Sequence, residues 1–134
     1  MYEQPLFLHT AQVAAHELSG AHEATHLHAL PQTSALAKSL EPLFSGEHAP
    51  QNFDVRLWTR ILRFSHFRIS EEEAADPEKI YEKGKEAYTA LRRVTSPMES
   101  AKVTDIDLAL KFANGIDRGV RRHTTMRRFG ELAG

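Results

Sequence analysis

The chain has 134 residues, with 17 Lys and Arg against 18 Asp and Glu, and it contains no cysteine. The lack of cysteine excludes disulfides, thiolate zinc sites, iron–sulfur clusters and thiol nucleophiles. No stretch approaches the roughly 20 apolar residues that a membrane-spanning helix needs. The first residues also lack the basic and apolar regions of a secretory signal, so we expect a cytoplasmic protein without a membrane span.

Charge divides the chain into two unequal parts. Residues 1–52 hold one basic residue, Lys38, against five Glu, and they hold six of the eight His. Residues 53–134 hold 16 basic residues against 13 acidic ones. We therefore predict a His-rich N-terminal arm of short helices over 1–52 and a helical core over 53–134. The short helices must dock on the core or remain partly disordered, because isolated helices of this length are marginal.

The predicted arm contains three helical candidates between its prolines and glycines. Thr10 is suited to cap a helix over 11–18, and two more helices are expected over 21–30 and about 34–44. Their apolar residues are mostly Ala and Leu, which are good helix formers. This part is expected to be less regular than the rest of the chain.

Segment 53–67 has the clearest amphipathic pattern. Its apolar residues recur with the 3.6-residue period of a helix, and Arg56, Arg60 and Arg63 recur on the opposite face. A helix is therefore favoured. A strand stays open as an alternative, because the segment is rich in aromatic and β-branched residues.

Two start signals precede the next helix. Ser70 and Glu73 match a capping box, and Asp76 followed by Pro77 is a second helix start. The helix that follows is expected to extend from Pro77 to about residue 94. Gly84 lies inside it, and we expect this glycine to permit close packing against a neighbouring element.

The last segment is also expected to be helical. Thr104 is suited to cap it, and Asp105 and Asp107 lie in its first turn, where the helix dipole favours negative charge. Asn114 and Gly115 are suited to end this helix and begin another. Together these signals predict an all-α fold, a small bundle of four to five helices with a less regular, His-rich N-terminal part.

A short motif in the arm has the spacing of a zinc site. His22, Glu23 and His26 form the pattern H-E-x-x-H, which resembles the zinc-metalloprotease signature over these five residues. In that pattern both histidines share a helix face and bind zinc, and the glutamate accepts a proton from metal-bound water. The longer form of the signature has Gly and His where this chain has Ala29 and Gln32, so no third ligand is identified. His22 and His26 are thus the candidate metal ligands, and no catalytic residue is assigned.

Arginine forms two rows that are suited to bind anions. Positive rows of this kind can contact an acidic protein face or nucleic-acid phosphates. The net charge of −1 is against a general nucleic-acid binder. The candidate residues for a partner or anion are Arg56, Arg60, Arg63, Arg118, Arg121, Arg122, Arg127 and Arg128.

These features favour a non-enzymatic helical interaction module, such as an adaptor, accessory subunit or assembly factor. Its partner would be another protein or a second copy of the chain, bound through apolar stripes and the arginine rows without a cofactor. One alternative is a zinc-dependent hydrolase that uses His22, Glu23 and His26. The other is a nucleic-acid-binding protein that uses the basic C-terminal helix.

Overall fold

The computed structural model describes residues 6–19, 31–96 and 101–133, and its regular elements in these ranges are all helices. In chain order they are α1 (Leu6–Ser19), α2 (Pro31–Phe44), α3 (Val55–Phe64), α4 (Glu71–Ala74), α5 (Pro77–Thr95) and α6 (Val103–Ala133). The predicted all-α class is confirmed. Six helices lie in the described ranges instead of four to five, because α4 is a separate single turn that ends just before the start signal of α5.

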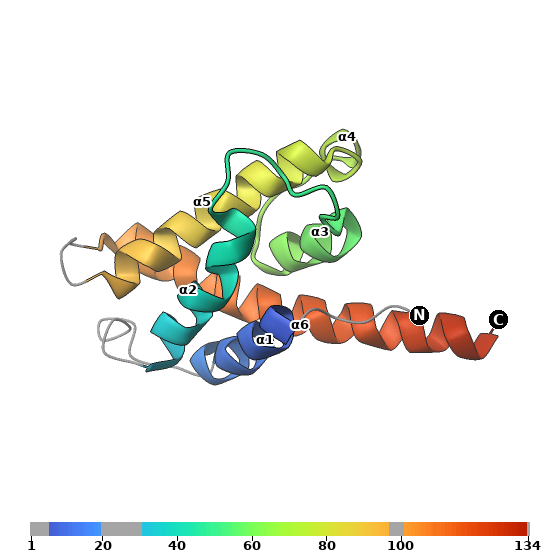
Figure 1. The fold of residues 1–134 in the computed structure, drawn as a ribbon, viewed down its shortest axis with the longest axis horizontal. Helices are drawn as coiled ribbons and strands as arrows, with labels where there is room; N and C mark the ends of the chain where they lie inside the picture. The colour runs from blue at the N-terminus through green and yellow to red at the C-terminus, as the bar shows by residue number, and fades with distance from the viewer. Residues whose placement is uncertain (1–5, 20–30, 97–100, 134) are drawn as a thin grey trace.

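The two N-terminal helices pack on the later ones. α1 contacts α2 and α6, and α2 also contacts α5 (Figure 1). Buried leucines of α1 and α2, among them Leu18, Leu36 and Leu40, belong to the same apolar cluster as residues of α3, α5 and α6. α1 begins before the predicted cap at Thr10, and the predicted helix over 21–30 lies outside the described residues.

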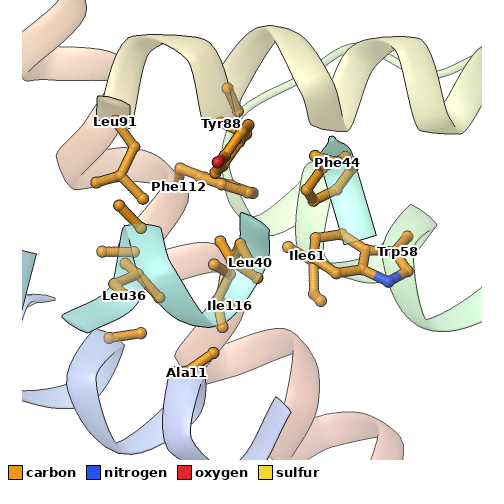
Figure 2. Close-up of a cluster of buried hydrophobic side chains, with 14 of the residues drawn as sticks. Ala11, Leu36, Leu40, Phe44, Trp58, Ile61, Tyr88, Leu91, Phe112 and Ile116 are labelled. Atoms are coloured by element: carbon orange, nitrogen blue, oxygen red, sulfur yellow. The ribbon is translucent and has the colours of Figure 1, made fainter. Parts of the chain in front are cut away.

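Aromatic rings fill the centre of this cluster (Figure 2). Phe44, at the end of α2, has its ring centroid 5.0 Å from that of Trp58 in an edge-to-face arrangement. It stacks on Tyr81 and Tyr88 of α5 at 5.4 and 5.6 Å. Such ring pairs add to the energy of apolar burial. On α5, a Cβ at Gly84 would lie 2.9 Å from two ring carbons of Phe44. The close packing predicted for this glycine is therefore confirmed.

Local capping starts the middle helices where the sequence predicts. Ser70 accepts a hydrogen bond from the backbone N–H of Glu73, and the Glu73 carboxylate accepts one from the N–H of Ser70. That backbone N–H, together with the nearby Lys83, lowers the pKa of Glu73. The Asp76 carboxylate caps α5 by accepting from the N–H of Glu78, and Pro77 is its first residue. Both predicted start signals are confirmed.

α3 ends in a turn that normally favours glycine. The N–H of Phe67 donates to the carbonyl of Leu62, and the N–H of His66 donates to that of Arg63. These two bonds form a Schellman motif, whose first residue past the helix cap adopts a left-handed conformation. His66 occupies that position with φ 69°, and among the described non-glycine residues it alone has a positive φ.

We expect His66→Gly to raise the free energy of unfolding by about 0.5 kcal/mol. Glycine lacks the Cβ that opposes this conformation, and we expect the relief of that steric strain to exceed the cost of the larger backbone entropy that glycine loses on folding. His66→Ala is the matched control, since it removes the imidazole but retains the Cβ. Urea unfolding followed by Trp58 fluorescence measures both variants. A glycine variant no more stable than the alanine variant contradicts the prediction.

α6 is one continuous helix from Val103 to Ala133, so the predicted break at Asn114 and Gly115 is wrong. Lys102, rather than Thr104, precedes its first turn, and the Asp105 carboxylate accepts a hydrogen bond from the N–H of Lys102. The C-terminal part of α6 extends beyond the other helices (Figure 1). Among the helices in the described ranges, none combines the length and apolar character that crossing a membrane requires.

Candidate functional site, an arginine-lined groove

α3 and α6 cross at close range through two glycines of α6. A Cβ at Gly115 would lie 2.5 Å from the carbonyl oxygen of Ile61, and a Cβ at Gly119 would lie 2.8 Å from the Cα of Ile61. A larger residue at either position would force the helices apart. Gly115, which was expected to break α6, instead allows α3 to lie against it together with Gly119, and this contact brings the two arginine rows together.

Two adjoining hollows lie along this crossing, with volumes of about 500 Å³ and about 300 Å³. Phe64 and Arg122 line both of them. We call them together the arginine groove, whose lining includes Arg60, Arg63, Phe64, Arg118, Arg121, Arg122 and Met126, with His16 and Asp117 from the α1–α6 contact. Two helices far apart in the sequence thus contribute five arginines to one surface.

The groove contains one buried carboxylate. Asp117 is 4% exposed and accepts a hydrogen bond from Arg121 one turn further along α6. Nδ1 of His16 lies 3.3 Å from the same carboxylate oxygen and 3.2 Å from a guanidinium nitrogen of Arg121. A neutral Nδ1 with a lone pair accepts from Arg121, whereas a protonated Nδ1 donates to Asp117. Arg121 therefore serves first to neutralise Asp117 and to tie α6 to α1.

Arg60 is also engaged within the fold. Its guanidinium lies 3.2 Å from Nδ1 of His123 on α6. Nε2 of His123 lies 3.6 Å from a carboxylate oxygen of Asp54, which caps the start of α3. The imidazole of His123 thus lies between the Arg60 guanidinium and the Asp54 carboxylate, which links α6 to both the interior and the start of α3. Arg60 thus supports the helix crossing in addition to lining the groove.

Three arginines of the groove remain available to a ligand. Arg63, Arg118 and Arg122 are exposed, and none of them forms an ion pair with a carboxylate in the described part of the chain. Arg118 and Arg122 are one turn apart on α6, so their side chains share a face. Arg63 lines the smaller hollow together with Arg122, and Phe64 lines both hollows. Positive charge is therefore concentrated at these three arginines, and no carboxylate of the described ranges pairs with them.

The other predicted arginines lie elsewhere. Arg56 is exposed on α3 but does not line the groove. Arg127 and Arg128 belong to the last turns of α6, and their side chains fall outside the described part of the chain. The groove therefore unites five of the eight arginines predicted to bind a partner, and their binding role stays a prediction.

The candidate metal ligands His22 and His26, with Glu23 between them, lie outside the described residues. Metal binding by this motif therefore stays a prediction. Within the described ranges, no three or more His, Asp or Glu side chains are grouped so that they could hold a metal ion.

Two tyrosines with shifted pKa values lie in the core, away from the groove. Burial raises the pKa of the Tyr81 hydroxyl, which donates a hydrogen bond to the carbonyl of Gly46. Burial also raises the pKa of Tyr88. Both rings contact Phe44, so the fold itself accounts for their environment.

Sequence reasoning missed five residues of the groove region: His16, Phe64, Asp117, His123 and Met126. Asp117 and Arg121 have the i,i+4 spacing of a helical ion pair, which is a readable signal. The histidine contacts have no such signal, because His16 is 101 residues from Asp117 and His123 is 63 residues from Arg60. Only the folded chain brings these residues together.

Comparisons with known proteins identify no relative. No protein-family model, no curated protein and no solved structure matches this chain. The exposed arginines of the groove and the apolar side chains of Phe64 and Met126 that line it are therefore the observations that bear on its ligand.

Proposed function

We propose that this chain is a non-enzymatic helical interaction module that binds an acidic region of a protein partner through the arginine groove. One observation carries the proposal. Arg63 from α3 and Arg118 and Arg122 from α6 border the same exposed groove without a carboxylate partner among the described residues. A cytoplasmic adaptor, accessory subunit or assembly factor is the kind of protein that fits such a surface.

The chemistry of arginine supports binding instead of catalysis. A guanidinium stays protonated in proteins, so it is poorly suited to transfer protons. Its planar donors match a carboxylate with two parallel hydrogen bonds. Single exposed ion pairs contribute little, but three adjacent cations that lose water together on binding contribute more. Affinity should therefore fall with ionic strength.

A protein ligand fits better than nucleic acid. The chain has a net charge of −1, whereas a general nucleic-acid binder is usually strongly basic. The apolar side chains of Phe64 and Met126 also line the groove. A phosphate backbone offers these side chains no apolar surface to bury. An acidic protein segment offers both carboxylates and apolar groups.

Fluorescence anisotropy at low salt tests this function with two probes, a labelled oligoglutamate peptide and a labelled DNA duplex. We expect the peptide to bind. The double variant Arg118→Gln/Arg122→Gln should lower the affinity for the peptide by about tenfold, equivalent to about 1.4 kcal/mol. The matched control is Arg56→Gln/Arg68→Gln, which removes the same charge from exposed positions outside the groove.

The control should retain most of the affinity for the peptide. Equal weakening by both double variants would show that net charge, and not the groove, attracts the peptide. Tighter binding of the duplex than of the peptide would favour the nucleic-acid alternative. Absence of binding to either probe would remove the groove as an anion site.

A further inference from the structure

We infer that the partner segment is an acidic amphipathic helix, which places an apolar side chain on Phe64 and Met126 while its carboxylates bind the surrounding arginines. This inference rests on the proposed function of the arginine groove. It adds a second requirement for tight binding: charge alone gives weak binding, and an apolar contact must accompany it for full affinity.

The apolar part of the groove is formed by Phe64 of α3 and Met126 of α6. Phe64 lines both hollows, and Met126 lines the smaller one together with Arg60, Arg63 and Arg122. Met126 is 46% exposed and is one of the few large apolar side chains that the described surface leaves open to water. An unbranched thioether adapts its shape to different partners, and Met, aromatic residues and Arg are enriched in protein interfaces.

The charged part of the groove comes from both helices. Arg63 lies on the α3 side, and Arg118 and Arg122 lie on the α6 side one helical turn apart. Carboxylates one turn apart on a partner helix have the same spacing of about 5–6 Å between Cβ atoms. A leucine or phenylalanine on that face would then lie above Phe64 and Met126. The pattern matches the binding of an amphipathic helix in a groove.

The geometry favours this occupant over a second copy of the chain. In the described ranges the exposed large apolar side chains other than Met126 are Val13 and Val103. Val13 lies one turn from Glu17, the single acidic residue of α1, and Val103 lies one turn from Asp107, whose carboxylate pairs with Lys111. Neither helix face offers two unpaired carboxylates one turn apart beside an apolar side chain. A copy of this chain would therefore match the groove only in part.

Two designed helical peptides of equal length and charge test the inference, one with leucine and one with alanine on the face that carries its glutamates. We expect the leucine peptide to bind about tenfold more tightly, because the larger side chain buries more apolar surface. Met126→Gln should narrow this difference, because only the Phe64 ring then remains to contact the leucine, whereas Arg118→Gln/Arg122→Gln should weaken the binding of both peptides. Circular dichroism of the variant checks that its helices persist.

Each outcome separates the inference from the proposed function. Equal binding of both peptides, with loss in Arg118→Gln/Arg122→Gln, would retain the arginine groove and overturn the apolar requirement. Failure of both peptides to bind would overturn the proposed function itself. Salt-sensitive self-association in light scattering that Met126→Gln leaves intact, but the arginine variant abolishes, would identify a second copy as the occupant and overturn the inference.

Discussion

Phe44→Ala is expected to lower the free energy of unfolding by about 3–5 kcal/mol. Phe44 is 1% exposed, and its ring contacts those of Trp58, Tyr81 and Tyr88. Removal of the ring forfeits its burial and leaves a cavity where α2, α3 and α5 meet (Figure 2). Denaturant unfolding followed by the single tryptophan measures the loss, since Trp58 lies beside the cavity.

A second substitution tests whether Phe44 and Gly84 are coupled. In the natural chain a Cβ at Gly84 would lie 2.9 Å from the Phe44 ring, so Gly84→Ala should cost about 1–3 kcal/mol through overpacking. In the Phe44→Ala background the added methyl group enters the vacated space. The double variant should then be less destabilised than the two single changes combined. Additivity within about 0.5 kcal/mol would show that the two sites act independently.

The helix starts in the middle of the chain could be predicted from the sequence, because local hydrogen bonds form them. Ser70 with Glu73, and Asp76 with Pro77, satisfy backbone N–H groups within one turn of their own helix. Such contacts need no distant residue, so sequence spacing alone predicts them. The amphipathic pattern of segment 53–67 was readable for a similar reason, because one face of α3 meets the core along its whole length.

The predictions that failed depended on tertiary contacts. Gly115 has the sequence signal of a helix end, but in the fold it lies against Ile61 and Ser65 of α3 inside a continuous helix. The turn after α3 was not predicted at all, and in it His66 takes a left-handed conformation that is uncommon for non-glycine residues. In both places tertiary packing around α3 outweighs the local conformational preference of the residue. A single sequence does not reveal such packing.

The candidate site was predictable only in its parts. Helical periodicity identified Arg60 and Arg63 on one row and Arg118 and Arg122 on another. The sequence does not show that both rows border one groove, because their meeting depends on the crossing of α3 and α6 at Gly115. It also does not show which arginines are neutralised within the fold.

Gly115→Ala is expected to lower the free energy of unfolding by about 3 kcal/mol or more, because overpacking against backbone cannot be relieved by a rotamer change. The new methyl group would lie 1.9 Å from Oγ of Ser65 and 2.5 Å from the carbonyl oxygen of Ile61. Alanine favours a helix interior over glycine by about 1 kcal/mol, which offsets only part of the cost. Thermal unfolding by circular dichroism measures the effect.

Two controls identify the cause of this loss. Gly46→Ala places its methyl group 3.7 Å or more from its neighbours, an ordinary contact distance, so its stability should change little. Ser65→Ala combined with Gly115→Ala removes the clash with the hydroxyl but leaves the clash with the Ile61 carbonyl. That pair should therefore recover little stability and should also lose the arginine groove, since α3 can no longer lie against α6. Full recovery in the pair would mean that the serine, and not the close approach of the two backbones, sets the requirement for glycine.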